Sequence, residues 1–230
     1  MWVNLRFVVG ALVISVLTST APASIIADFA GDYQPNSPRT GWAYLWNANG
    51  PVGNAANYVA LQPTANNGGD YETGVSGNNV AVLPTAVIPG AGLTQDPGGI
   101  ERCAILAYTI SAANIAAAGN QGYIDDYRFE VPLSSVDGVT ASIYVNNTPI
   151  IIGLPFPGGF VYDRSFPDAY AMPLGSVSAG DTIYIAIGGG ATGNGDQLGI
   201  AYTINLVPEP AALSVLGVLG VGLLGRRRGR

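Results

Sequence analysis

The stretch 137-DGVTASIYVNNTPIII-152 has the pattern of a β-strand between two tight turns. The residues at 137–138 and 146–147 are Asp, Gly and Asn, which tolerate the positive φ angles that hairpin turns require. Between the turns the side chains alternate, so Ile143 and Tyr144 are expected on opposite faces of the strand. The stretch therefore predicts an antiparallel hairpin.

The same pattern, a turn followed by an alternating strand, recurs along the chain. Residues 179–181 form a second turn signal, and the three isoleucines of 183–187 share one face of the strand that follows. Runs rich in Val, Ile, Tyr and Thr alternate with Gly, Asn, Asp and Pro clusters, as in an all-β sandwich or barrel. Strands are predicted at 25–29, 42–46, 58–61, 80–83, 104–110, 123–131, 139–145, 160–162, 182–187 and 200–206.

We therefore predict an all-β fold: one antiparallel β-sandwich, jelly-roll-like, over residues 24–206, with long loops rich in Gly and Asn. The segment 111–120, SAANIAAAGN, is the exception to the β pattern. Its serine start, alanine density and glycine stop predict a short surface helix.

The composition is typical of an exported, turn-rich β protein. The 230 residues include 32 Gly and 16 Pro but no His, and only 10 % are charged, against about 25 % in an ordinary globular protein. The lack of histidine excludes Ser-His-Asp and Cys-His catalysis and the commonest zinc ligand. The single cysteine, Cys103, rules out an internal disulfide and is expected to be a buried apolar residue rather than a reactive thiol.

The charge balance argues against nucleic-acid binding. Between residues 24 and 207 four arginines stand against fourteen carboxylates, which gives a net charge of −10. Neutralising phosphates needs a basic face that this segment cannot assemble.

Residues 1–23 have the three parts of a secretory signal peptide. One arginine precedes an apolar stretch from Phe7 to Leu17, and the triplet Ala21-Pro22-Ala23 suits cleavage after Ala23. The alternative, a first transmembrane helix, needs about 20 apolar residues, and this stretch is far shorter.

The chain ends on a second apolar segment, 207-VPEPAALSVLGVLGVGLLGRRRGR-230. As a helix, the run 211–225 would measure roughly 22 Å against a hydrocarbon core of about 30 Å, which is marginal for a permanent anchor. Arg226, Arg227 and Arg228 would hold its far end in the cytoplasm. An uncleaved single-pass anchor is the alternative to a processed tail.

The order of Pro208, Glu209, Pro210, a short apolar helix and a terminal arginine cluster resembles the PEP-CTERM sorting signal of Gram-negative bacteria. The resemblance implies that a membrane processing enzyme, exosortase, acts on residues 207–230 after transient insertion in the inner membrane. It also implies delivery to the cell surface or extracellular matrix, together with exopolysaccharide. The segments GWAYLW, DGVTASIYVNN and VSAGDTIYIAIG resemble, in outline, the carbohydrate-binding-like sandwiches found ahead of such tails.

Trp42, Tyr44 and Trp46 are candidates for a ligand face, because alternate residues of a strand share one side. A planar aromatic strip is suited to stacking on sugar rings. The alternative is that the same strip packs in the core, where large aromatic side chains contribute most.

Acidic residues in or near loops are the other candidates. Calcium could bind among Asp125, Asp126, Asp163, Asp168, Asp181 and Asp196, although solvated turn carboxylates are the simpler interpretation and no cofactor is required. A glycosidase would need two carboxyl groups across a cleft. Glu101 with Glu130, or Asp70 with Glu72, are the candidates for such a pair.

The sequence thus favours a non-enzymatic surface or matrix protein whose sandwich binds polysaccharide or another extracellular partner. The alternatives are a purely structural matrix protein and a secreted polysaccharide-active enzyme.

Overall fold

The hairpin expected around residues 137–152 is formed by β10 (Val139–Val145) and β11 (Thr148–Phe156), with the turn at 146–147. The computed structural model describes residues 23–65, 69–75, 79–135, 137–164, 171–193 and 196–209. Within these ranges almost all regular structure is β, and the two α-helices, α1 (Phe29–Asp32) and α2 (Ala112–Ala118), are short.

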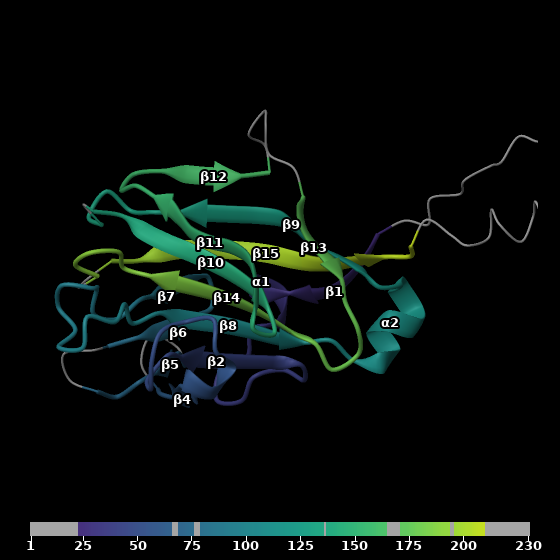
Figure 1. Ribbon diagram of the computed structural model, residues 1–230, viewed down its shortest axis with the longest axis horizontal. Helices are drawn as coiled ribbons and strands as arrows, with labels where there is room; N and C mark the ends of the chain where they lie inside the picture. The colour runs from purple at the N-terminus through teal and green to yellow at the C-terminus, as the bar shows by residue number, and fades with distance from the viewer. Residues whose placement is uncertain are drawn as a thin grey trace, which may run out of the picture. The chain divides into compact units, whose positions relative to one another are not determined.

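The strands form two antiparallel sheets packed face to face (Figure 1). The smaller sheet has the order β11-β10-β14-β8-β2-β3, and the larger one β12-β9-β15-β7-β6-β5-β4, with β1 on β15 and β13 on β9. The remaining strands of the smaller sheet are β2 (Trp42–Trp46), β3 (Val59–Ala60), β8 (Ala104–Thr109) and β14 (Thr182–Gly188). Those of the larger sheet are β1 (Ser24–Asp28), β4 (Gln62–Pro63), β5 (Tyr71–Glu72), β6 (Ala81–Leu83), β7 (Ala86–Ile88), β9 (Gln121–Glu130), β12 (Val161–Asp163), β13 (Met172–Ser176) and β15 (Leu198–Val207).

From β7 to β15 the chain follows the jelly-roll path. The strand pairs are nested: β10 lies against β11, β9 against β12 and β13, β8 against β14, and β7 against β15. Successive pairs alternate between the two sheets, which is how a long hairpin rolls up into a jelly roll. The β-sandwich prediction is confirmed, and β1 to β6 extend the sheets beyond this unit.

Apolar and polar side chains alternate along the strands, and the apolar ones point between the two sheets, where they form the core. Ile143 of β10, the isoleucines of β14, and Leu198, Ile200 and Tyr202 of β15 all belong to the main apolar cluster. A smaller cluster of Cys103, Ile105 and Ala186 lies on the outer side of the smaller sheet, where side chains of the 52–58 loop pack against it.

The helix predicted at 111–120 is α2. Ser111 caps its first turn by accepting the Asn114 N–H at 3.1 Å, while Asn114 accepts the Ser111 N–H at 2.9 Å. Gly119 ends the helix at φ +95°.

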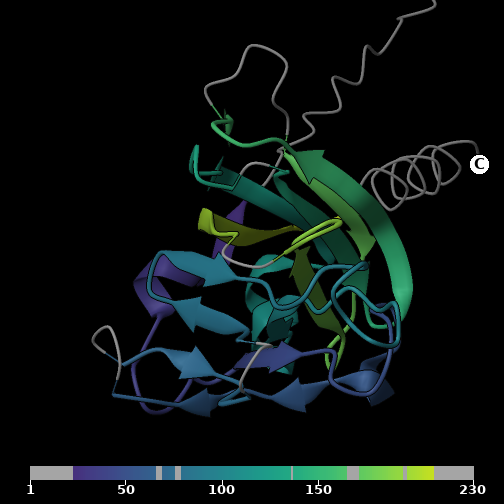
Figure 2. The ribbon, with the colours of Figure 1, turned by 90° about the vertical axis from the view of Figure 1, so that its left-hand side faces the viewer.

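The two ends of the sandwich domain lie side by side. Ser24 of β1 pairs with Leu206 of β15, and α2 is at the same end, which we call the exit end. The loops 89–103, 131–138 and 189–197 are at the opposite end of the strands, which we call the loop end. In Figure 1 the exit end is on the right, and Figure 2 faces the loop end.

Gly119 lies against the point where β15 leaves the sandwich. A Cβ built on Gly119 would be 2.5 Å from the backbone nitrogen of Pro208, which no real Cβ contact allows. Its positive φ adds strain for any other residue. We expect Gly119→Ala to lower the free energy of unfolding by about 1–3 kcal/mol. Chemical denaturation measures the change, and Gly180→Ala is the matched control. Gly180 has a similar φ of +93° but open space around it, so its substitution should cost only the backbone strain and not the steric clash.

Candidate functional site

The predicted aromatic strip lies in the core. Trp42, Tyr44 and Trp46 do share one face of β2, but that face points between the sheets. Trp42 is 6 % exposed, Tyr44 is 2 % exposed, and Trp46 is half-buried against the same cluster. The proposed ligand face is therefore not available for stacking on sugars, because the strip is covered by the opposite sheet.

The strip belongs to an aromatic cluster that spans both sheets. The Trp42 ring contacts Tyr108 edge-to-face at 5.2 Å between centroids, and Tyr44 lies 4.7 Å from Tyr71. Phe29 stacks on Tyr202 at 5.7 Å. The Tyr44 hydroxyl is buried without a hydrogen-bond partner, and burial raises its pKa.

Asp125 and Asp126 do not form a chelate. The register between β9 and β15 shifts there and Asp126 adopts φ +46°, which marks a β-bulge. Asp125 pairs with Arg164 at 2.8 Å, whereas Asp126 is exposed.

The other acidic candidates are dispersed. Asp181 accepts the Ser178 N–H at 2.7 Å and the Asn146 amide at 2.8 Å, which stabilises the turn before β14. Asp163 is half-buried in β12, and Asp168 is outside the described residues. Asp196 is different, because it is 4 % exposed and one of its oxygens has no partner.

Glu101 and Glu130 are on opposite outer faces of the sandwich. The Glu101 carboxylate accepts from the Thr140 hydroxyl at 2.8 Å and the Gly190 N–H at 2.7 Å, on the smaller sheet. Glu130 is exposed on β9 of the larger sheet. Two sheets and a core separate them, so they cannot flank one glycosidic bond.

Asp70 and Glu72 also fail to form a catalytic pair. Asp70 is fully buried and accepts the Thr64 hydroxyl at 2.5 Å, whereas Glu72 is half-buried on β5. Cys103 is 3 % exposed, and its burial raises the pKa of the thiol, with the nearby Glu101 charge raising it further. The sulfur is therefore held as an unreactive thiol, as the sequence indicated.

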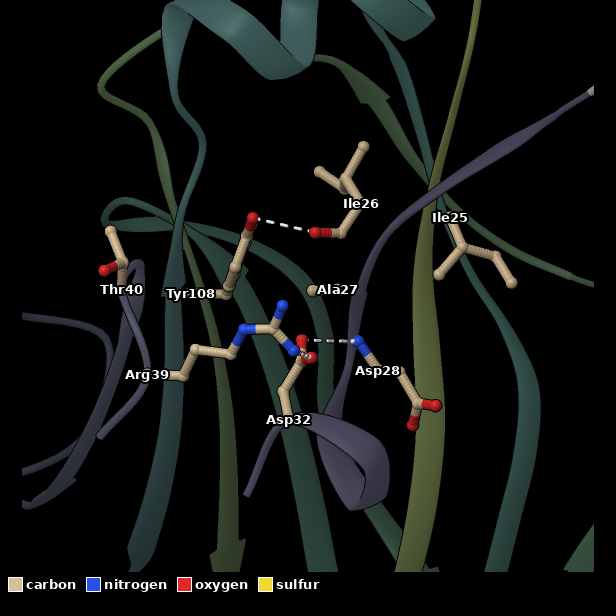
Figure 3. A pocket seen from close by; sticks show the side chains of 8 residues that line it. All are labelled: Ile25, Ile26, Ala27, Asp28, Asp32, Arg39, Thr40 and Tyr108. Atoms are coloured by element: carbon tan, nitrogen blue, oxygen red, sulfur yellow. Dashed lines mark hydrogen bonds and ion pairs between the residues drawn. The ribbon is translucent and has the colours of Figure 1, made fainter. Parts of the chain in front are cut away.

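A pocket of about 330 Å³ lies beside β1, and we call it the edge pocket (Figure 3). Arg39 pairs there with Asp32, which also accepts the Trp42 indole N–H at 3.1 Å and the Asp28 N–H at 3.1 Å. The Tyr108 hydroxyl donates to the Ile26 carbonyl at 2.9 Å. These polar groups form ion pairs and hydrogen bonds with one another. The residues that line the edge pocket therefore connect β1 to the smaller sheet.

A larger depression, of about 450 Å³, lies on the outer face of the larger sheet, over β7, β9 and β15, and we call it the sheet hollow. Its small residues are Ala86, Gly199 and Ala201, which leave space between the neighbouring strands. Polar side chains surround this space, namely those of Thr85, Arg128, Glu130 and Gln197.

Gly199 makes room for the sheet hollow. It stands opposite Glu130 across the β9–β15 ladder, and its neighbours in β15, Leu198 and Ile200, point into the core. A Cβ at this position would meet its nearest atoms at 3.4 and 3.5 Å, so a side chain would fit but would fill the space.

The polar groups of the sheet hollow are accessible to a ligand. Arg128 and Glu130 pair at 2.9 Å, but their side chains are 60 % and 51 % exposed. Solvent screens such an exposed pair, so it contributes little to stability and ligand hydroxyl groups can replace it at little cost. The sequence indicated Glu130 only as one member of a possible glycosidase pair and did not predict the sheet hollow.

The predicted sorting motif is only partly described. Pro208 and Glu209 follow β15 without regular structure, whereas Pro210, Arg226, Arg227 and Arg228 are outside the described residues, as is most of the predicted signal peptide. None of the helices in the described ranges has the length and hydrophobicity needed to traverse a membrane. No protein-family model, curated protein or solved structure matches the chain significantly.

Proposed function

We propose that this is an exported cell-surface or matrix protein, trimmed at a PEP-CTERM-type tail, whose sandwich binds a neutral polysaccharide in the sheet hollow without catalysis. In this account, residues 1–23 direct export and residues 207–230 are inserted transiently in the inner membrane and processed by an exosortase-type enzyme. The folded domain between them performs the function outside the cell.

The observation that carries the proposal is the position of the sheet hollow relative to the chain ends. Both ends of the domain leave from the exit end, where Ser24 pairs with Leu206. The hollow is at the other end of the same strands, where Glu130 pairs with Gly199. A protein held by its tail would therefore keep the hollow away from the attachment point.

The chemistry of the sheet hollow fits sugar hydroxyl groups. Arg128 supplies donors only and Glu130 acceptors only, while Gln197 and Thr85 offer both. A hydroxyl group donates and accepts, so it can bind to either partner. The net charge of −10 between residues 24 and 207 favours a neutral chain over an acidic one.

Affinity electrophoresis of the purified exported protein against neutral polysaccharides from the producing cells tests the proposal. We expect retardation of the wild type and its loss in Gly199→Val, which fills the sheet hollow without changing charge. The double variant Arg128→Gln/Glu130→Gln removes the ion pair and also keeps the net charge, so it should lose at least tenfold in affinity, about 1.4 kcal/mol.

The matched control is Arg164→Gln/Asp125→Asn. It removes a partly exposed ion pair between β9 and the segment after β12, again at constant net charge, and should be retarded like the wild type. Retardation that survives Gly199→Val would place the ligand elsewhere. No retardation of the wild type by any polysaccharide would favour the purely structural role, and release of reducing ends would favour an enzyme.

A further inference from the structure

A row of four side chains crosses the larger sheet near the exit end, and we call it the exit row. The strand register pairs Pro173 of β13 with Tyr123 of β9, Tyr123 with Asn205 of β15, and Asn205 with Ile25 of β1. These strands are neighbours in the sheet (Figure 1). At about 4.8 Å between strands, the exit row is roughly 14 Å long.

The exit row lies on the outer face of the larger sheet. The next residues along its strands, Ile124, Leu174 and Leu206, belong to the core, and successive side chains of a strand point to opposite faces. Ile25 is 64 % exposed, and Pro173 is also exposed. The exit row therefore presents apolar side chains to solvent on the same face that carries the sheet hollow.

Tyr123 is the aromatic member of the exit row, and its side chain is available to a ligand. It is half-buried and forms neither a hydrogen bond nor a ring contact within the described residues. The tyrosines of the aromatic cluster differ, since they pack ring against ring, as Tyr44 and Tyr71 do at 4.7 Å. A tyrosine at the surface combines an apolar ring with a polar tip, which suits stacking on a sugar ring.

Asn205 is the polar member of the exit row, and it has no partner in the protein. It is 7 % exposed, its Oδ1 is buried without a hydrogen bond, and its Nδ2 forms none within the described residues either. Asparagine is disfavoured inside strands, and a buried unpaired amide is destabilising, so the fold gains nothing from Asn205. An amide that both donates and accepts suits a ligand hydroxyl group. Side chains at the surface change rotamer within nanoseconds, so Tyr123 and Ile25 can separate and uncover it.

We infer that the exit row is a second binding site for the same neutral polysaccharide, an inference that rests on the proposed function of the sheet hollow. The Tyr123 ring stacks on a sugar ring, and the Asn205 amide binds the hydroxyl groups of that sugar. The protein thus binds one polysaccharide chain at two places on one face.

The distance between the two sites suits a polymer. Gly199 and Asn205 both belong to the outer face of β15 and are six positions apart, which corresponds to about 20 Å. A chain bound in the sheet hollow reaches the exit row without a second encounter, so the two contacts together raise the apparent affinity. The pair Arg164–Asp125 lies between the two sites, beside Thr203, and belongs to neither of them.

The size of the exit row favours a sugar chain over a protein partner. A stable protein interface buries about 800 Å² on each partner, which is far more than one row of four side chains offers. Polar groups flank the row on both sides along the strands. Gln121 donates to Ser176 at 2.7 Å on one side, and Arg164 pairs with Asp125 on the other.

The test is calorimetric titration of the purified exported protein with short fragments of the polysaccharide that retards it, shorter than about 20 Å so that each fills one site. The wild type should bind two fragments, and Tyr123→Ala and Gly199→Val should bind one each. Tyr123→Phe keeps the ring and should bind two. Against the whole polymer, Tyr123→Ala should lose about tenfold in apparent affinity. Ile152→Ala, which truncates an exposed apolar residue of the smaller sheet, should match the wild type.

Asn205→Val separates binding from folding. Valine favours a strand and removes the unpaired amide, so Tm should stay the same or rise while the variant binds only one fragment. A lower Tm together with two bound fragments would make Asn205 a structural residue and overturn its part in the site.

The outcomes distinguish the two sites. If Tyr123→Ala binds as many fragments as the wild type while Gly199→Val binds fewer, the exit row is overturned and the sheet hollow stands. The reverse result overturns the sheet hollow and keeps the exit row, and a wild type that binds no fragment overturns both. A dimer of the wild type that is lost in Tyr123→Ala, seen by sedimentation, would make the exit row a contact between copies and overturn the inference.

Discussion

Trp42→Ala is expected to lower the free energy of unfolding by about 3–5 kcal/mol, because it removes a large buried aromatic side chain and leaves a cavity. The indole packs on Phe29, Tyr108 and Tyr202, so the loss affects both sheets. It also deprives Asp32 of one of its donors. Urea unfolding, followed by far-UV circular dichroism, measures the change.

The control for this experiment is Tyr44→Phe, two residues along the same strand. It keeps the ring but removes a buried hydroxyl that has no partner, so stability should stay the same or rise. A Trp42→Ala protein that unfolds at the wild-type urea concentration but loses polysaccharide retardation would contradict the core assignment. It would restore the aromatic strip as a ligand face.

Arg102→Ala should have a similarly large effect, about 3–5 kcal/mol, because it breaks a buried ion pair from one side. The Arg102 Nε lies 2.6 Å from Asp96 Oδ2, and the two side chains are 13 % and 5 % exposed. The guanidinium also donates to the carbonyls of Asn47 and Ala48 at 2.8 and 2.9 Å. Its removal leaves the charge of Asp96 without a counter-charge and removes two of the hydrogen bonds that hold the 47–50 turn to the loop before β8.

The effect of Arg102→Ala should depend on pH. The Arg102 hydrogen bond lowers the pKa of Asp96, and the N–H groups of Gly98 and Ile100 add to this. A lowered pKa in the folded state stabilises the protein above the unfolded value of about 3.9, and this stabilisation is lost as pH falls through the folded value. The difference between wild type and variant should therefore be full at pH 7 and shrink below about pH 4.

The exposed pair Arg128–Glu130 provides the comparison, since solvent screens it and Arg128→Ala should change stability very little. An Arg102→Ala effect as small as that of Arg128→Ala, or one that grows towards acid pH, would contradict the buried-pair account.

Local sequence patterns predicted the long strands and the helix, because alternation and turn residues act within a few positions. The stretch 42–46 was correctly predicted as a strand with its three aromatic residues on one face. The pattern could not tell which way that face points, since a period of two is the same for a core strip and a binding strip. Only the opposite sheet decides this.

Several strands escaped prediction for identifiable reasons. Each of β4, β5 and β7 has only two or three residues, too few for a period to show. β11 contains Pro149 and Pro155, which argue against a strand but are tolerated because β11 is at the edge of its sheet.

The sites depend on register and on loop contacts, which no local pattern encodes. Gly199 makes a hollow only because β15 places it opposite Glu130. Ser135 and Gln197 are far apart in the sequence and are hydrogen-bonded because the jelly-roll path brings their loops to one end.

The central claim is that both termini are removed and that the acidic sandwich alone remains outside the cell. Intact-mass analysis of the protein recovered from the surface and medium of the producing cells tests it directly. The account predicts a chain that begins at Ser24 and lacks the apolar stretch and arginine cluster that follow Pro210. A full-length chain of 230 residues and 23.6 kDa, recovered from the cytosol, would contradict it.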